Sequence, residues 1–439
     1  MKNRFYFNKF SALFLLATLT AFAGFAQSTN FPVPRQEKLL NGLKVLMWND
    51  SKAEKISLKI RVHSGSSFDP QGREGVMQML ADNIFPNESL REFFTDDLGG
   101  SLEITTTHDY VQINATAKPD EFITMLETLA NAVIKPTIDK ETTAKLRASR
   151  LERLKELEKN PAFVADRAVA QRLLGTFPYG RPVSGTTESL QKIEYADLIF
   201  AKDRFFTADN ATVAVTGNIK PELAFRAVRR YFGAWTKSDG KIRSTFRQPD
   251  EPDTKTFEIT AFTSGNPEIR FALRGLARND ADFAASKILT AILKTRLEKL
   301  GAQENAFNFA VRQDEHILPG LLILGYSTQR KSTAPNVNEA KAVKSTGSLF
   351  NPALLFSKPV SSEEFSKAKN ETLVEISAKN QADWWLDADT FRLNSVSEEM
   401  KNFNQVALAD VQRVAEKLSK NPIVSVIITP TEENATIKN

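Results

Sequence analysis

The feature that most constrains the fold is a helix-to-strand pattern that occurs twice along the chain. Ala196-Asp197-Leu198 begins a predicted helix that leads into an apolar strand at residues 211–215, and Ala409-Asp410-Val411 begins another that leads into a strand at residues 423–428. Ala196 and Ala409 are 213 residues apart. Solenoid repeats have periods of about 20–50 residues, so this spacing indicates a duplicated domain.

Local patterns predict a mixture of helices and strands around this repeat. Ser361 and Glu364 stand three residues apart and form a capping box that opens one further helix. Because strands and helices do not alternate strictly, the predicted fold class is α+β. The strands are predicted at residues 39–49, 56–62, 102–107, 110–117, 211–216 and 423–428, and the other helices at 75–85, 120–134, 140–158, 189–206 and 221–232.

The first 26 residues are interpreted as a secretory signal peptide. Three cations, Lys2, Arg4 and Lys9, precede an apolar run at residues 10–25, and the first 26 residues contain no acid. Gly24-Phe25-Ala26 resembles a small-residue cleavage site. An uncleaved anchor is the alternative, but the run is shorter than the roughly 20 residues of a membrane helix. We therefore expect a periplasmic or secreted protein without a membrane span after cleavage.

The rest of the chain is expected to divide into two lobes, residues 27–238 and 255–439, joined by a polar linker at 239–254 that contains two prolines. Without the leader the chain carries 55 Lys and Arg against 53 Asp and Glu, a balance that gives no case for nucleic acid. There is no cysteine, so neither disulfides nor thiol chemistry is available.

Four motifs, in order and spacing, resemble the insulinase-like metallopeptidases, the group that includes pitrilysin and the mitochondrial processing peptidase. This resemblance extends over essentially the whole chain after the leader. It implies two homologous α+β lobes, each a mainly antiparallel sheet packed with helices, that face each other across a chamber. The motifs are Asn41-Gly42-Leu43-Lys44-Val45, Gly72-Arg73-Glu74-Gly75, Phe177-Pro178-Tyr179-Gly180-Arg181-Pro182-Val183-Ser184-Gly185-Thr186 and Asn210-Ala211-Thr212-Val213-Ala214-Val215-Thr216-Gly217-Asn218-Ile219.

The metal motif of that family, H-x-x-E-H, is replaced at every functional position. Gln78 and Asp82 stand where the resemblance places the two histidines, and Ala81 stands where it places the general base. The distal glutamate falls near Arg153, or at Glu152 with a shift of one residue. We therefore predict no zinc in this chain; calcium or magnesium on Gln78, Asp82 and Glu152 is a weaker alternative, because these ions prefer oxygen ligands.

No other chemistry-bearing group replaces the missing motif. The only histidines, His63, His108 and His316, are widely separated and are predicted to be surface residues rather than ligands. Neither a G-x-S-x-G elbow nor a P-loop occurs.

In two-chain bacterial members of the family, the zinc-less subunit holds substrate with an arginine and a tyrosine of its second lobe. The resemblance places Arg296 and Phe307 in that region, with Arg296 interpreted either as a substrate contact or as a packing salt bridge. Trp384 and Trp385 are interpreted as core and rim packing, with a peptide- or sugar-binding surface as the alternative.

The leading functional hypothesis is a non-catalytic subunit that pairs with a zinc-bearing homologous peptidase to bind or degrade peptides. The alternatives are a stand-alone peptide-binding or scaffold protein of the periplasm, and a zinc metalloendopeptidase with a rebuilt site.

Overall fold

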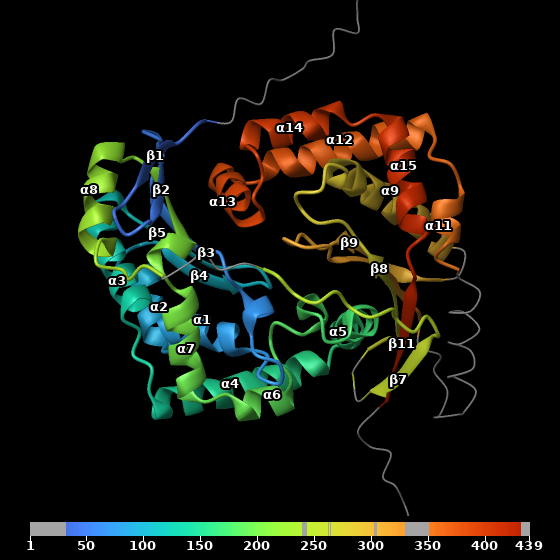
Figure 1. Cartoon of the computed structure of the whole chain (residues 1–439), viewed down its shortest axis with the longest axis horizontal. Helices are drawn as coiled ribbons and strands as arrows, with labels where there is room; N and C mark the ends of the chain where they lie inside the picture. The colour runs from blue at the N-terminus through green and yellow to red at the C-terminus, as the bar shows by residue number, and fades with distance from the viewer. Residues whose placement is uncertain are drawn as a thin grey trace, which may run out of the picture.

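The structure, a computed structural model, describes residues 32–238, 244–261, 263, 265–302, 305–329 and 351–431. These residues form two lobes, one coloured blue to green and the other yellow to red in Figure 1. Each lobe is a β-sheet packed with helices, which confirms the predicted α+β class with two lobes. The leader proposed for residues 1–26 and part of the proposed linker lie outside the described residues.

The two sheets share one strand order and one pairing pattern. In the first sheet, of order β1-β2-β6-β3-β5-β4, only the β2–β6 pair is parallel. The second sheet, of order β7-β11-β8-β10-β9, repeats this arrangement without an equivalent of β1, and its β7–β11 pair is the parallel one. The strands are β1 (Arg35–Lys38), β2 (Lys44–Asn49), β3 (Ile56–Val62), β4 (Ser101–Thr106), β5 (Val111–Ala117), β6 (Ala211–Gly217), β7 (Phe257–Ala261), β8 (Glu268–Arg274), β9 (Phe307–Gln313), β10 (Leu321–Ser327) and β11 (Val424–Pro430).

The helices cover the sheets and connect their strands. The first lobe contains α1 (Val76–Ile84), α2 (Glu88–Asp96), α3 (Phe122–Ile134), α4 (Lys140–Glu158), α5 (Pro161–Leu174), α6 (Thr187–Lys192), α7 (Tyr195–Phe205) and α8 (Pro221–Phe232). The second contains α9 (Phe283–Gly301), α11 (Leu354–Ser357), α12 (Ser362–Ala378), α13 (Gln381–Phe391), α14 (Val396–Gln405) and α15 (Leu408–Ser419). Among the described residues, no helix combines the length and apolar character that crossing a membrane would require.

Local sequence signals account for several helix boundaries. The capping box at Ser361 is confirmed: its hydroxyl accepts the Glu364 N–H at 3.1 Å, and its own N–H donates to the Glu364 carboxylate at 3.1 Å. The single helix predicted over 189–206 is wrong, because Glu194 starts a new helix by donating its N–H to Asp197 at 2.8 Å. The sequence analysis also missed α5, although Asn160 caps it by accepting the Ala162 N–H at 2.9 Å.

Each lobe places one helix against the sheet of the other lobe. Helix α5 packs on β8 and β11, and its Val164, Ala165 and Val169 share an apolar cluster with residues of the second sheet. Helix α13 packs on the first sheet in the same way, with Ala382 and Leu386 in a cluster with residues of β2 and β6. Figure 1 shows α5 beside the yellow-to-red lobe and α13 facing the blue-to-green lobe. The lobes are therefore joined by two exchanged helices.

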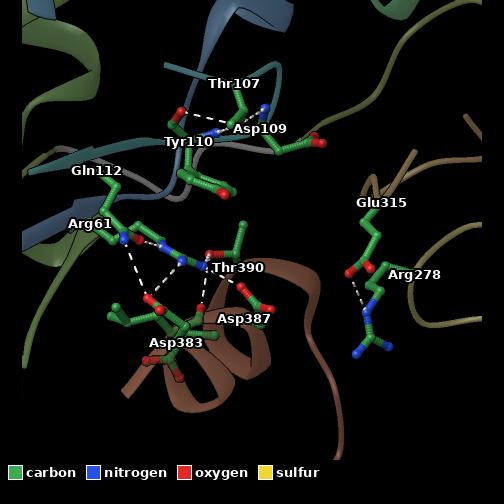
Figure 2. A network of polar contacts seen from close by, with 12 residues as sticks. Arg61, Thr107, Asp109, Tyr110, Gln112, Arg278, Glu315, Asp383, Asp387 and Thr390 are labelled. Atoms are coloured by element: carbon green, nitrogen blue, oxygen red, sulfur yellow. Dashed lines mark hydrogen bonds and ion pairs between the residues drawn. The ribbon is translucent and has the colours of Figure 1, made fainter. Parts of the chain in front are cut away.

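Ion pairs, one of them buried, reinforce the contact between α13 and the first sheet. The Arg61 guanidinium on β3 donates to the Asp387 carboxylate on α13 at 2.5 Å, and only 2% of the Arg61 side chain is exposed. Lys59 pairs with Asp383 at 2.6 Å, and Lys44 pairs with Asp389 at 2.7 Å. Figure 2 shows Arg61 between Gln112 of its own sheet and the acids of α13.

Candidate functional site

Helix α1, where the family's metal motif would stand, is buried on all but one face. It begins after Gly75, whose φ of 104° lies in the left-handed region that favours glycine. The Asp69 carboxylate caps it by accepting the N–H groups of Gly75 and Met77 at 2.8 and 2.9 Å. Burial raises the pKa of Asp69 to about 7, against the opposing effect of these two hydrogen bonds.

The partly exposed face of α1 carries Gln78 and Asp82, which stand where the family motif has its two histidines. Asp82 is held by Arg150 of α4, which donates Nε and Nη2 to the two carboxylate oxygens. The Gln78 amide lies 3.5 Å from the same carboxylate. Ala81, at the position of the lost base, is fully buried in the core.

These residues do not fit a zinc ion. Both oxygens of Asp82 accept from a guanidinium, which occupies the position that a dication would need and repels positive charge. Glu152 cannot complete a calcium or magnesium site here, because its side chain is 69% exposed and pairs with Lys155. Across the described ranges, no three His, Cys, Asp or Glu side chains gather closely enough to hold a metal.

A pocket of about 400 Å³ adjoins the exposed face of α1 and lies between the lobes. The first lobe contributes Gln78, Arg150 and Arg153, together with residues of α5 and of the turn at 179–184. The second lobe contributes residues of β9 and β10 and the loop between them, including Arg312 and Asp314. Two of the degenerate metal positions, Gln78 and Arg153, thus line a cavity that both lobes share.

The prediction that the three histidines are surface residues is wrong. His63, on the inner face of the first sheet, hydrogen-bonds Thr390 of α13 at 2.9 Å and Thr212 of β6 at 3.0 Å. Burial, together with the charges of Arg61 and Lys44, lowers its pKa to about 4 although Asp389 opposes this change. His63 is therefore a neutral contact between the lobes at neutral pH.

His108 and His316 come from different lobes and meet at ring centroids 5.2 Å apart. His316 Nδ1 lies 2.8 Å from the Asp109 carboxylate, and its ring stacks on Tyr179 at 4.0 Å. Tyr179 donates its hydroxyl to Asp109 at 2.8 Å. Burial, with a smaller effect from His316, lowers the pKa of His108 to about 4. Burial and the neighbouring Asp109 raise the pKa of Tyr179.

Sequence reasoning missed this cluster because its members are distant in the chain. Tyr179 belongs to one of the family motifs, and Asp109 follows His108 in a hairpin turn. Neither position in the sequence indicates which distant side chain the residue contacts. The available signal was three consecutive polar or aromatic side chains, His108-Asp109-Tyr110, at the tip of a predicted hairpin. Such a turn ordinarily carries exposed polar residues, whereas Asp109 is 1% exposed.

Arg296 lies in α9, away from the pocket. Its five N–H groups all have acceptors: the Glu364 carboxylate takes two, and the carbonyls of Leu355, Lys358 and Pro359 take the others. This geometry favours the packing role over contact with substrate. Phe307, the first residue of β9, is partly buried and does not line the pocket either.

The two tryptophans of α13 pack in different environments. Trp384 is 1% exposed and packs against Phe403 with ring centroids 6.4 Å apart. Trp385 is partly buried and contacts the apolar clusters of both lobes. Neither side chain forms an exposed aromatic surface, so the structure supports core and rim packing.

The fold and the site define a two-lobed homologue of zinc peptidases in which the metal-site positions have been replaced. A family model for the insulinase peptidases (family M16) matches residues 44–187, and a model described as the inactive domain of the same peptidase family matches residues 192–372. The chain belongs to this insulinase family, as the motifs predicted.

Individual relatives agree with this assignment. An uncharacterised zinc protease YmxG of Bacillus subtilis is 22% identical over 226 residues, 50% of this chain and 54% of the relative. A non-peptidase homologue YmxG of Helicobacter pylori is 23% identical over 301 residues, 63% of this chain and 67% of the relative. The chain spans about half the length of the zinc proteases among these relatives.

A solved structure shows the same fold. The crystal structure of a peptidase M16 inactive domain from Pseudomonas fluorescens superposes with a TM-score of 0.78 at 20% identity and covers 91% of this chain and 98% of its own.

Proposed function

We propose that this chain is a non-catalytic member of the family that pairs with a zinc-bearing homologous peptidase and contributes to the binding or degradation of peptides. The observation that carries the proposal is the Arg150–Asp82 ion pair on the degenerate face of α1. It supplies neither a metal ligand nor a base, so the hydrolytic water would have to be activated elsewhere.

The way in which the two lobes are joined supports a role that uses the cavity between them. The lobes are joined by exchanged helices and ion pairs, and the pocket between them is lined from both sides. The domain limits given above, export by the leader, and a periplasmic or secreted location form part of this proposal.

The test begins with the purified chain alone, assayed for zinc content and for cleavage of a peptide library. We expect no stoichiometric zinc and no cleavage. One zinc per chain, with cleavage that a chelator abolishes, would establish the metalloendopeptidase alternative instead.

The second step mixes the chain with a zinc-bearing homologue that retains H-x-x-E-H and is encoded in a neighbouring reading frame. We expect a complex on size-exclusion chromatography and a gain in peptide cleavage over the homologue alone. If neither occurs while the chain still binds peptides, it acts as a stand-alone peptide-binding protein.

A further inference from the structure

The charged residues that line the pocket beside α1 are mostly arginines, although the family motif there would hold a metal cation. Five guanidinium groups line it, from Arg150, Arg153, Arg167, Arg181 and Arg312, against the two carboxylates of Asp166 and Asp314. His108 adds no charge at neutral pH. The lining residues of the pocket therefore carry an excess of three positive charges.

The two acids of the lining are already engaged by arginines. Asp166 accepts from Arg270 at 2.7 Å and from Arg312 at 2.9 Å, and Asp314 accepts from Arg312 at 3.1 Å. Three lining arginines are also paired with acids outside the pocket: Arg150 with Asp82, Arg167 with Glu158 and Arg181 with Glu74. These pairs hold the guanidinium groups in place and partly balance their charge.

Unused donors remain on the arginines. Arg153 is exposed, and no carboxylate within the described parts of the chain lies within salt-bridge distance of it. Arg167 donates one of its five N–H groups, to Glu158. Arg181 contributes less, because its two Nη atoms donate to the carbonyls of Asp69 and Ser67 and its Nε is buried. Guanidinium groups with free donors bind carboxylates in a bidentate, directional manner.

The pocket also has an apolar part. Leu157 and Phe163 line it from the first lobe, and Leu321 and Ile323 line it from the second. Its volume falls within the range of about 300–1,000 Å³ that is usual for ligand pockets. A short peptide segment with one acidic and one apolar side chain matches both parts.

We propose that this pocket binds a carboxylate of a peptide, so that the degenerate metal site has become an anion-recognition site for acidic peptides. The proposal rests on the peptide-binding part of the proposed function. The carboxylate can come from an Asp or Glu side chain or from a free C-terminus, and the guanidinium groups supply the same chemistry to each.

The experiment measures binding to the purified chain by isothermal titration calorimetry with three short peptides. One is apolar with a central Gln and blocked ends, one has Glu in place of the Gln, and one keeps the Gln but has a free C-terminal carboxylate. We expect the Glu peptide or the free-carboxylate peptide to bind about tenfold tighter than the blocked Gln peptide, with the advantage shrinking as salt is raised. The peptide whose affinity exceeds that of the blocked Gln peptide identifies the source of the carboxylate.

Charge reversal at the pocket supplies the matched variants. Arg153→Glu should weaken binding of the favoured peptide about tenfold and leave the blocked Gln peptide unchanged, because it removes an attraction and adds a repulsion. Arg153→Lys keeps the charge but not the bidentate geometry, so it should weaken binding less than Arg153→Glu does. Arg226→Glu, at an exposed position on α8 outside the pocket, is the control with the same change of charge.

Equal binding of all three peptides, or equal effects of Arg153→Glu and Arg226→Glu, would overturn the anion site while leaving peptide binding intact. Failure of every peptide to bind would overturn the anion site and the peptide-binding part of the proposed function together. Failure of the mixing assay alone would affect only the pairing with a zinc-bearing subunit.

Discussion

Replacing Asp387 with Ala tests whether the lobes are held together by buried charge. Asp387 and Arg61 have side-chain exposures of 6% and 2%, and they belong to different lobes. Burial would raise the pKa of Asp387, but the charges of Lys379 and Arg61 outweigh it, so its pKa is lowered and the carboxylate is ionised at neutral pH. Asp387→Ala therefore leaves a buried guanidinium without its main partner.

The expected cost follows from the contacts that remain. Removing one partner of a buried ion pair costs about 3–5 kcal/mol of unfolding free energy. Arg61 would keep its hydrogen bond to Gln112 at 2.6 Å and a weaker contact with Asp383 at 3.7 Å. We therefore expect Asp387→Ala to lower the unfolding free energy by about 3 kcal/mol, near the lower end of this range.

The assay is urea unfolding followed by tryptophan fluorescence, since Trp384 and Trp385 lie on the same helix as Asp387. Glu141→Ala is the control, because Glu141 pairs with Lys145 at 2.7 Å while both side chains are more than three-quarters exposed. Exposed pairs contribute about 0–1 kcal/mol, so this variant should change little. A double variant, Arg61→Met with Asp387→Leu, should recover most of the loss, because no unpaired guanidinium remains in the core. Lys379, which also pairs with Asp387, has a side chain that is 29% exposed, so water can solvate it in this variant.

A small effect of Asp387→Ala, no larger than that of Glu141→Ala, would refute the reasoning. It would mean that α13 does not dock on the first sheet in solution and that Arg61 is hydrated there.

Three further predictions concern pH, packing and the pocket. Because the pKa of His63 is about 4 when folded and about 6.5 when unfolded, the unfolded chain binds the extra proton between these values, and stability should fall as pH falls from 6.5 to 4. His63→Gln should reduce that loss by about 1–3 kcal/mol in urea titrations across this range, and an unchanged pH profile would contradict the assignment. Arg296→Met should lower the unfolding free energy by about 3 kcal/mol, because three backbone carbonyls and Glu364 lose their donor, yet peptide affinity in calorimetry should stay the same. Asp82→Asn should strengthen binding of the acidic peptide about threefold, since the charge of Arg150 is no longer balanced; weaker binding would argue against the anion site.

Much of the fold could be predicted because its signals are local. The capping residues at Ser361 and the alternation at residues 56–62 depend only on neighbours in sequence, and both predictions are confirmed. Helix α5 was missed although Asn160 and Pro161 formed an adequate start signal, because its buried residues face the other lobe and leave a weak amphipathic pattern. A helix packed between two lobes need not show one apolar stripe.

The absence of the zinc motif at the candidate site could be predicted from the sequence, whereas the contacts that its side chains form could not. Gln78, Ala81 and Asp82 occupy adjacent turns of one helix, so their residue types alone exclude the family's zinc motif. That Arg150 binds Asp82, 68 residues away in sequence, could not be read from the chain. The position of His316 against Asp109, across 207 residues and two lobes, was hidden for the same reason.

The sequence by itself therefore determined the duplication and the family, and it predicted the loss of the metal ligands, because each depends on residue type at a fixed spacing along the chain. Only the tertiary structure decided that the histidines join the lobes, that α5 and α13 are exchanged between them, and that arginines from α4, α5 and β9 surround the former metal face. The physical reason is that charge and periodicity indicate which residues of a segment are exposed to water and which are buried. The partner of a buried side chain depends instead on how segments distant in sequence pack together.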